Sequence, residues 1–254
     1  GLRNGFAGTF NGNDHAITGL SVVVATGYAG LFGNLTGTVQ NLQVTGSVTA
    51  SGKVMAVGGI VGYSAGGTVQ NCLNKVNISA PQVNCPVGGV VGESSNKPND
   101  NTASSTVNLC WNEGTVTGGS DSTGGIVGTN SKGTVTNCAN FGEVKGSSTA
   151  SGIVGSGAVA NSYNLGDVTG AEGSAYGISS RAATNSYYLC KLNGADKKAY
   201  VNNASENEVK YNEADKTYTV GEDAALLVDK LNENRSSGTP WFVNQDKGVY
   251  LPIH

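Results

Sequence analysis

The stretch GGIVGTNSKGTVTNC, from Gly124 to Cys138, repeats an earlier stretch of the chain almost letter for letter. The earlier copy, GGIVGYSAGGTVQNC, runs from Gly58 to Cys72, and GGVVGES opens a further copy at Gly88. A catalytic site needs one constellation of residues, whereas recurrence at a regular spacing is typical of a repeated structural unit. We therefore interpret each copy as one coil of a stacked β structure.

A glycine–apolar–apolar–glycine word marks the start of each repeat. It begins at Gly30, Gly59, Gly89, Gly125 and Gly152, and a degraded copy begins at Gly177. These starts lie 29, 30, 36, 27 and 25 residues apart, and the longest interval contains a polar stretch, Ser94 to Ser105, that we interpret as an inserted loop. Periods of roughly 20 to 50 residues are typical of solenoids, in which a single unit cannot bury its apolar face alone.

Each repeat contains two further β-prone words, which are bounded by glycine or asparagine. Examples of the second word are GTVQNCLN at Gly67 and GTVTNCAN at Gly133, and examples of the third are GTVTG at Gly114 and GEVKG at Gly142. Three strands and three corners close one turn of a triangular coil. The sequence therefore predicts an all-β fold, a right-handed parallel β-solenoid (β-helix) of about five or six triangular coils.

Stacked coils place equivalent side chains above one another, at a spacing of roughly 4.8 Å. We therefore predict three vertical columns of side chains. The first holds Val39, Val69, Val107, Val135 and Val159; the second holds Leu42, Cys72, Cys110, Cys138 and Ser162; the third holds Asn74, Asn112, Asn140 and Asn164. Asparagine tolerates the left-handed conformation that a corner needs, and stacked amides can hydrogen-bond along a column.

The two ends of the chain differ from the repeats. Residues 1–26 are predicted to form an N-terminal capping coil, residues 27–190 the solenoid, and residues 191–254 a small C-terminal α/β cap. The cap contains one predicted helix, EDAALLVDKLNEN, from Glu222 to Asn234. The apolar residues of one face of this helix are Ala225, Leu226, Val228 and Leu231. A small separate domain is the alternative, but about 65 residues is marginal for independent folding, which favours a cap over the last coil.

Composition excludes several classes of function. The net charge is −3 and charged residues make up 13% of the chain, without a Lys/Arg cluster on which phosphates could sit, so we expect no nucleic-acid partner. The longest aliphatic run, VVVA from Val22 to Ala25, is far too short to span a membrane, so we expect no membrane insertion by this segment. No glycine-rich word is followed by Lys-Ser or Lys-Thr, and we expect no cofactor.

Five cysteines are present, which is an odd number. Three of them belong to the second column, which favours small buried side chains over a disulfide framework. No spacing typical of a zinc site occurs. Cys85 and Cys190 lie outside the column. The sequence leaves open whether these two form a disulfide, which requires Cβ atoms about 4 Å apart.

The word GLFG at Gly30, its later GIVG forms and the TVxNC words that follow them resemble the GLUG motif of bacterial surface proteins. The opening stretch, Phe6 to Leu20, resembles the segment that opens such arrays, and the resemblance covers roughly residues 5 to 190. GLUG repeats occur in large adhesins and beside immunoglobulin A peptidase domains. The resemblance therefore implies a bacterial protein that is extracellular or attached to the cell surface. The zinc-binding HExxH motif of those peptidases is absent from this sequence, which implies that any protease activity lies elsewhere in a longer chain.

Glu143 and Asp167 occupy the same position in neighbouring repeats. Their Cα atoms are expected about 5 Å apart on the outer face, close to the carboxyl separation of roughly 5 to 5.5 Å that a retaining glycosidase needs. An outward, solvated face gives no desolvation to separate the two pKa values, and Lys145 is near enough to neutralise them. We therefore predict no catalytic residues and no metal site, with Glu143 and Asp167 as weak metal candidates only.

The position after the cysteine column holds several aromatic residues. From coil to coil it is occupied by Leu73, Trp111, Ala139, Tyr163 and Tyr187. An exposed aromatic row can stack on sugar rings, so Trp111, Tyr163 and Tyr187 are candidate ligand-binding residues. The alternative is that these residues only pack, by covering a corner of the coil.

These observations favour a non-enzymatic module of a bacterial cell-surface protein, acting in adhesion or as an extended stalk. We expect a monomeric fragment of a larger protein, with a host glycoprotein or glycan as the possible partner. A polysaccharide-active or carbohydrate-binding β-helix, such as a lyase or hydrolase, is the first alternative, and a pure spacer is the second.

Overall fold

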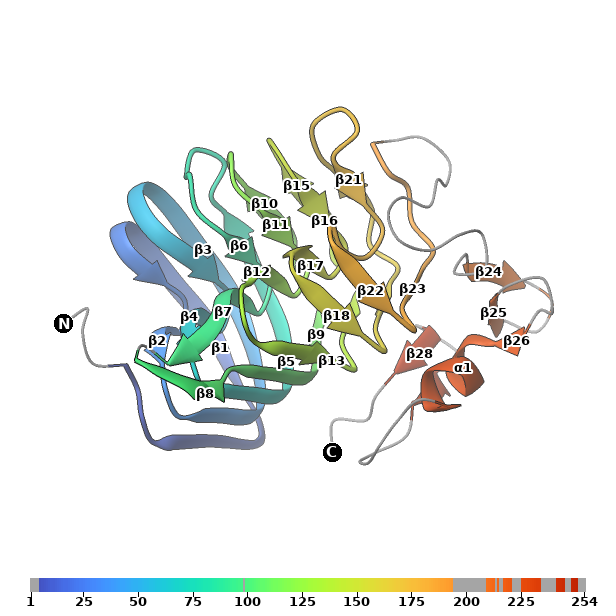
Figure 1. Cartoon of the computed structure of the whole chain (residues 1–254), viewed down its shortest axis with the longest axis horizontal. Helices are drawn as coiled ribbons and strands as arrows, with labels where there is room; N and C mark the ends of the chain where they lie inside the picture. Colours follow the sequence, from blue (N-terminus) through green and yellow to red (C-terminus); the bar gives the residue numbers. More distant parts are fainter. Residues whose placement is uncertain are drawn as a thin grey trace.

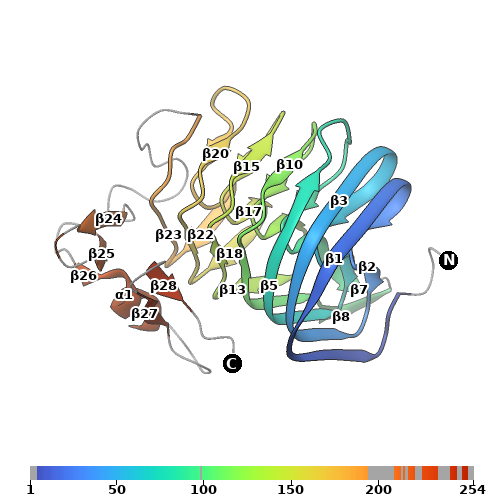
Figure 2. The same cartoon turned by 180° about the vertical axis from the view of Figure 1, so that it is seen from behind.

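The chain winds around one axis as a stack of coils (Figure 1). The computed structural model describes residues 5–97, 99–193, 209–212, 214, 217–220, 225–233, 241–244 and 248–250. Successive coils follow one another along the long axis of the molecule, and the C-terminal elements lie beyond the last of them (Figure 2). The predicted class, an all-β parallel β-solenoid, is confirmed.

The largest sheet has 17 strands, and every strand pairing in it is parallel. Its strands are β1 (Thr9–Ala29), β3 (Thr38–Gly58), β5 (Thr68–Ser79), β6 (Val87–Gly88), β9 (Thr106–Asn112), β10 (Val116–Gly118), β11 (Thr123–Gly124), β13 (Thr134–Thr136), β14 (Ala139–Asn140), β15 (Val144–Gly146), β16 (Ala150–Ser151), β18 (Ala158–Ala160), β19 (Tyr163–Asn164), β20 (Val168–Thr169), β21 (Ala175–Tyr176), β22 (Ala182–Thr184) and β23 (Tyr187–Tyr188).

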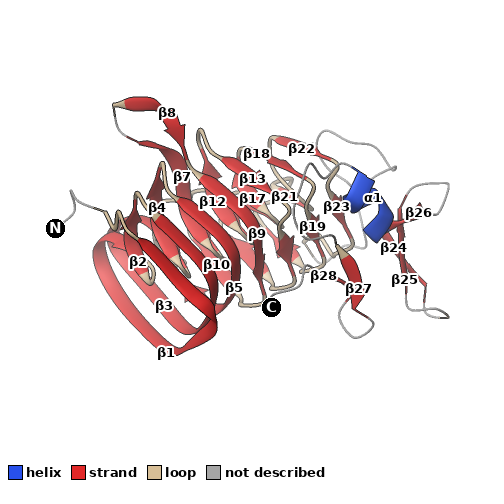
Figure 3. Cartoon of the chain, turned by 90° about the horizontal axis from the view of Figure 1, so that it is seen from below, coloured by secondary structure: helices blue, strands red, loops and turns tan. Residues whose placement is uncertain are grey.

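The glycine words continue into a second, six-stranded sheet. Its parallel strands are β2 (Phe32–Leu35), β4 (Val61–Ala65), β7 (Val91–Lys97), β12 (Val127–Asn130) and β17 (Val154–Ser156). The sixth strand, β8 (Asp100–Ser104), is antiparallel to β7 and projects from the stack (Figure 3). The polar insertion predicted as a loop is therefore largely a β-hairpin.

The predicted valine column is confirmed by the strand register. Val39 pairs with Val69, Val69 with Val107, and Val107 with Val135, and all four side chains are buried. Fully burying one such side chain contributes about 1.5 to 3 kcal/mol. The column begins at Phe10, which pairs with Val39, and ends at Ala183 in β22, which pairs with Val159. It therefore passes through seven coils, because the first coil and residues 182–192, which lack the glycine word, both join the stack.

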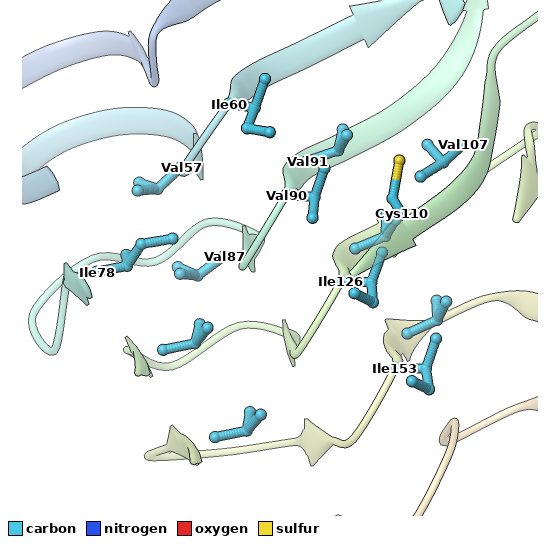
Figure 4. Packing of buried hydrophobic residues seen from close by; sticks show 14 of the residues in the cluster. Val57, Ile60, Ile78, Val87, Val90, Val91, Val107, Cys110, Ile126 and Ile153 are labelled. Atoms are coloured by element: carbon cyan, nitrogen blue, oxygen red, sulfur yellow. The ribbon is translucent and has the colours of Figure 1, made fainter. Parts of the chain in front are cut away.

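The glycine words bury their two apolar residues on the inside of the stack. The same position in four successive coils holds Ile60, Val90, Ile126 and Ile153, and each of these side chains is fully buried (Figure 4). The amide of Ile126 donates to the carbonyl oxygen of Ile153 at 2.9 Å, which holds one coil on the next. The apolar positions of this word thus supply both the core and the ladder between coils.

The predicted cysteine column is also confirmed. Leu42 pairs with Cys72 and Cys72 with Cys110, and in the next coils the amide of Cys138 donates to Ser162 Oγ at 3.0 Å. Each column thiol faces a backbone carbonyl, as Cys110 Sγ does with the carbonyl oxygen of Asn108 at 3.3 Å. These thiols are therefore small core residues with a weak polar contact.

The predicted asparagine column forms a buried amide ladder, which we call the Asn ladder (Asn74, Asn112, Asn140 and Asn164). Along it each Nδ2 donates to the Oδ1 of the next coil, at 2.7, 2.8 and 2.8 Å. The ladder begins at Asn74 because Val44 occupies the preceding slot, and it ends where Tyr188 follows Asn164. The prediction that stacked amides bond along the column is confirmed.

The expectation that these asparagines adopt the left-handed conformation is wrong, because that corner lies three residues earlier. Asn41, Asn71, Asn137, Asn161 and Asn185 have φ between 44° and 54°. In the fourth coil Leu109, with φ 54°, takes this corner in place of an asparagine. The corner amides form a second ladder, in which Asn71 Nδ2 donates to Asn41 Oδ1 at 2.9 Å.

In the words that begin at Gly59, Gly89, Gly125 and Gly152, the first glycine is needed because its backbone packs against the Asn ladder. A Cβ added to Gly59 would lie 2.2 Å from Asn74 Oδ1, and one added to Gly125 would lie 2.5 Å from Asn140 Cγ. No side chain fits at such distances. This contact explains why the glycine word and the ladder asparagine occur together in the same repeat.

The C-terminal segment contains antiparallel strands and one short helix within the residues that the structure describes. They are β24 (Val209–Asn212), β25 (Thr217–Val220), β26 (Ala225–Leu226), α1 (Leu227–Glu233), β27 (Phe242–Asn244) and β28 (Gly248–Tyr250). The helix is shorter than predicted, because Leu226 pairs with Thr219 as part of β26. Its buried residues are Leu227, Val228 and Leu231, and no described helix is long and apolar enough to cross a membrane.

Candidate functional site

The predicted aromatic row exists as a column in consecutive coils. Leu73 pairs with Trp111, Trp111 with Ala139, and Ala139 with Tyr163, which in turn pairs with Tyr187. The row is not exposed, as stacking on sugar rings would require. The exposed fractions of Trp111, Tyr163 and Tyr187 are 4%, 0% and 6%.

The row is buried because the C-terminal segment covers it. Its members share one apolar cluster with Val220, Leu227, Val228, Leu231 and Trp241. The ring of Trp241 meets that of Tyr163 edge to face, with centroids 5.2 Å apart. Burial, together with the charge of Glu233, raises the pKa of Tyr187. The row therefore packs, as the alternative supposed, but it is covered by the C-terminal segment and does not itself cover a corner. Contact between the row and a glycan stays a prediction.

Glu143 and Asp167 lie in adjacent coils, next to the paired residues Val144 and Val168. Each carboxylate has a different partner. Glu143 forms an exposed ion pair with Lys145 at 2.8 Å, and Asp167 Oδ1 accepts a hydrogen bond from the amide of Lys191 at 2.9 Å. Among the described residues no group of three or more His, Cys, Asp or Glu side chains is placed to hold a metal ion.

Cys85 and Cys190 are both free thiols in the structure, and both are buried. Burial is the main cause that raises the pKa of each thiol to about 12. The charges of Asp121 and Glu93 add to the shift at Cys85. Neither thiol is therefore a reactive nucleophile at neutral pH.

Sequence reasoning missed a second group of side chains, which we call the Tyr–Glu cluster (Tyr28, Tyr63, Glu93 and Asp121). Tyr63 lies in β4 and pairs with Glu93 in β7 of the next coil. Tyr28, near the end of β1, stacks on Tyr63 with ring centroids 5.0 Å apart and planes inclined by 14°. All four residues are half-buried. The cluster thus places two phenols and a carboxylate on three consecutive coils.

The two tyrosines meet because the backbone turns sharply beside a glycine. A Cβ on Gly62 would lie 2.9 Å from both N and O of Ala29, so this corner closes tightly against β4. The side chain before the corner, Tyr28, is thereby held beside the one that follows Gly62, which is Tyr63.

Negative charge gathers in the Tyr–Glu cluster. Burial is the largest cause that raises the pKa of Glu93; Asp121 adds to it, and a hydrogen bond with the side chain of Ser131 opposes it. Burial also raises the pKa of Tyr28, with further contributions from Tyr63 and Glu93. Within the described residues, no ion pair involves Glu93 or Asp121.

A signal for this cluster exists in the sequence. The position after each glycine word holds Asn34, Tyr63, Glu93, Thr129 and Ser156. Reading it as a column places Tyr63 next to Glu93, as the register shows. The place of Tyr28 depends on the geometry of the corner, which no periodic pattern gives.

Fold and site together define the class of protein: a parallel β-solenoid with a buried Asn ladder, a covered aromatic row and one anionic, tyrosine-lined cluster. No protein-family model matches this sequence, and no curated protein sequence matches it. The GLUG resemblance is therefore unconfirmed at the level of the motif.

The fold is similar to the crystal structure of a "putative immunoglobulin A1 protease from Bacteroides ovatus". The TM-score is 0.69 at 20% sequence identity, and the likeness covers 96% of this chain and 77% of that chain. At this identity the likeness shows the fold. It is consistent with the association with immunoglobulin A peptidases that the GLUG resemblance implies.

This likeness contradicts the prediction that the chain is not an enzyme, because the similar protein is described as a protease. The prediction rested on Glu143 and Asp167, which it placed on an outward, solvated face. In a solenoid, other residues about one repeat apart also become neighbours, as Tyr63 and Glu93 do.

Proposed function

We propose that this chain is a β-solenoid module of an extracellular bacterial protein, and that it binds a host glycoprotein or its glycan. The likeness to the Bacteroides ovatus protein over 96% of this chain is the observation that carries the proposal. An immunoglobulin is itself a glycoprotein of the host. A module with this fold would hold such a partner, or extend as a stalk that presents the binding surface.

The architecture suits this role. Each coil contacts only its neighbours, so a solenoid extends linearly and presents the same positions repeatedly along one face. One such outward position holds Ser47, Asn77, Thr115, Glu143 and Asp167 in successive coils. Short polar side chains on a rigid backbone offer hydrogen-bond groups at little cost in side-chain entropy.

Binding of the purified chain to a glycan array and to immobilised human immunoglobulin A1 tests the proposal. Saturable binding to a glycan, or to the glycoprotein, is the expected result. A folded chain, checked by circular dichroism, that binds neither would contradict the proposal and favour a spacer.

A second candidate is proteolysis of immunoglobulin A1, which the description of the similar structure favours. Incubating the chain with human immunoglobulin A1 and separating the heavy chains by electrophoresis tests it. New heavy-chain fragments, absent when the chain is first heat-unfolded, would support a protease. Intact heavy chains after prolonged incubation would count against protease activity in this segment.

A further inference from the structure

We propose that the Tyr–Glu cluster accepts one basic side chain, a lysine or an arginine, from a protein partner. The proposal rests on the proposed role as a binding module and names the chemistry of the contact. It is carried by the placement of Tyr28, Tyr63 and Glu93 on three consecutive coils.

The geometry offers acceptor groups in a row. Strand register sets Tyr63 beside Glu93, and neighbouring parallel strands lie about 4.8 Å apart. The rings of Tyr28 and Tyr63 cover one face of each other, and both residues are only half-buried. A phenol oxygen and a carboxylate are both acceptors, and an ammonium or guanidinium group supplies three to five donors.

The charge of the cluster points to a cation. Elsewhere in the described chain Glu113, Glu143 and Glu233 each face a lysine within 3.2 Å. Glu93 is half-buried, lies within the field of a second carboxylate, Asp121, and forms no such ion pair with any residue that the structure describes. A bound cation would offset both the lost hydration and the repulsion between the two carboxylates.

A neutral sugar is the competing ligand, because aromatic rings and carboxylates also occur at sugar sites. Tyr28 and Tyr63 stack on each other, so less ring face is free for a pyranose than on an isolated ring. Two carboxylates that form no ion pair with a described residue also favour a charged donor over neutral hydroxyl groups. These two observations favour the basic side chain.

Titration of the full chain with a blocked pentapeptide, four glycines around a central arginine, tests the proposal, with tyrosine ring signals in NMR as the readout. The control peptide carries citrulline, which has nearly the same shape and no charge. We expect the arginine peptide to shift the signals of Tyr28 and Tyr63, and its affinity to fall as salt is added.

Glu93→Gln keeps the shape of the side chain and is expected to weaken binding of the arginine peptide about tenfold, which corresponds to about 1.4 kcal/mol. Tyr63→Phe is a second variant, expected to weaken it several-fold through loss of the hydroxyl. Glu143→Gln is the matched control, because that carboxylate is exposed and pairs with Lys145. It is expected to leave binding unchanged.

Equal binding of the citrulline peptide, or unchanged binding by Glu93→Gln, would overturn the proposal. So would a neutral glycan whose binding depends on Glu93. The outcome is separable from that of the proposed function. If glycoprotein binding survives Glu93→Gln, the site proposal fails alone, whereas arginine binding without any glycoprotein or glycan binding means that the proposed function fails alone.

Discussion

Asn112 Nδ2 donates to Asn140 Oδ1 at 2.8 Å, and both side chains are fully buried inside the stack. Asn112 also donates to the carbonyl oxygen of Gly114 at 2.8 Å, and its Oδ1 accepts from Asn74 Nδ2 and from the amide of Gly114. A buried amide with partners on every side is stable in such a core, and each bond joins one coil to the next or closes a corner.

The first prediction concerns Asn112→Ala, which removes this amide from the centre of the Asn ladder. The buried donor of Asn74 and the acceptor of Asn140 then lose their partners, and each unsatisfied group costs about 1 to 3 kcal/mol. We expect the free energy of unfolding to fall by about 3 kcal/mol, measured by urea denaturation. The control is Asn77→Ala, whose hydrogen bonds to Thr115 lie at the exposed surface.

A loss below about 1 kcal/mol for Asn112→Ala, or an equal loss for both variants, would mean that the ladder contributes no more than a surface contact. The measurement also tests cooperativity. If breaking the ladder separates the coils into independent units, the denaturation curve will show more than one transition.

The second prediction concerns Gly125→Ala in the glycine word. The added methyl group would lie 2.1 Å from the carbonyl oxygen of Gly152 and 2.5 Å from Asn140 Cγ, both of them buried. Because backbone and ladder must both shift, we expect a loss of more than about 3 kcal/mol or failure to fold. Gly8→Ala is the control, since its nearest neighbour is the ring of Phe6 at 3.3 Å. A folded Gly125→Ala chain of nearly normal thermal stability would contradict this close packing.

The solenoid and its columns follow from the sequence because each repeated position is set by a local constraint that recurs once per turn. Valine meets valine in the core, and each ladder asparagine leaves no room for a side chain on the glycine that packs against it. The position of the corner differs from the prediction because most repeats contain two asparagines with different roles. Asn71 adopts the left-handed φ at the corner, whereas Asn74 donates a hydrogen bond inside the stack.

The candidate site was predicted less well than the fold. Trp111, Tyr163 and Tyr187 align as expected, but their burial depends on residues far away in the sequence, above all Trp241. Trp241 lies outside the repeats, so no periodic pattern in the sequence predicts its contact with the row. The Tyr–Glu cluster was missed for a related reason, because each of its members occurs once and only the register brings them together.

The third prediction concerns Trp241→Ala, which uncovers the aromatic row. The Trp241 side chain is 2% exposed and its ring contacts Tyr163, so its removal leaves a cavity over the row. We expect a loss of about 3 to 5 kcal/mol, measured by chemical denaturation, together with increased binding of a hydrophobic dye. Replacing the exposed Val23 with alanine is the control and is expected to change stability by less than about 0.5 kcal/mol. Unchanged dye binding by Trp241→Ala would show that the segment does not cover the row in solution.

The last prediction is a pH dependence set by Glu93. Burial raises the pKa of this carboxyl in the folded chain above its ordinary value of 4.5, so the folded state holds the proton more tightly than the unfolded state does. Stability contributed by this group is therefore full below the unfolded pKa and is lost as the pH rises through the folded pKa. Glu93→Gln removes the ionisation, and we expect the variant to be more stable than the wild-type chain at pH 7 and equally stable at pH 3.

Thermal unfolding of both chains across this range measures the difference, with Glu143→Gln as the control, because that carboxylate is exposed and paired with Lys145. A gain for Glu93→Gln that is as large at pH 3 as at pH 7 would mean that packing, not charge, separates the two chains. The experiment also bears on the cation site: if an arginine peptide stabilises the wild-type chain at pH 7 but not Glu93→Gln, the burial penalty measured in the free chain is relieved by the ligand.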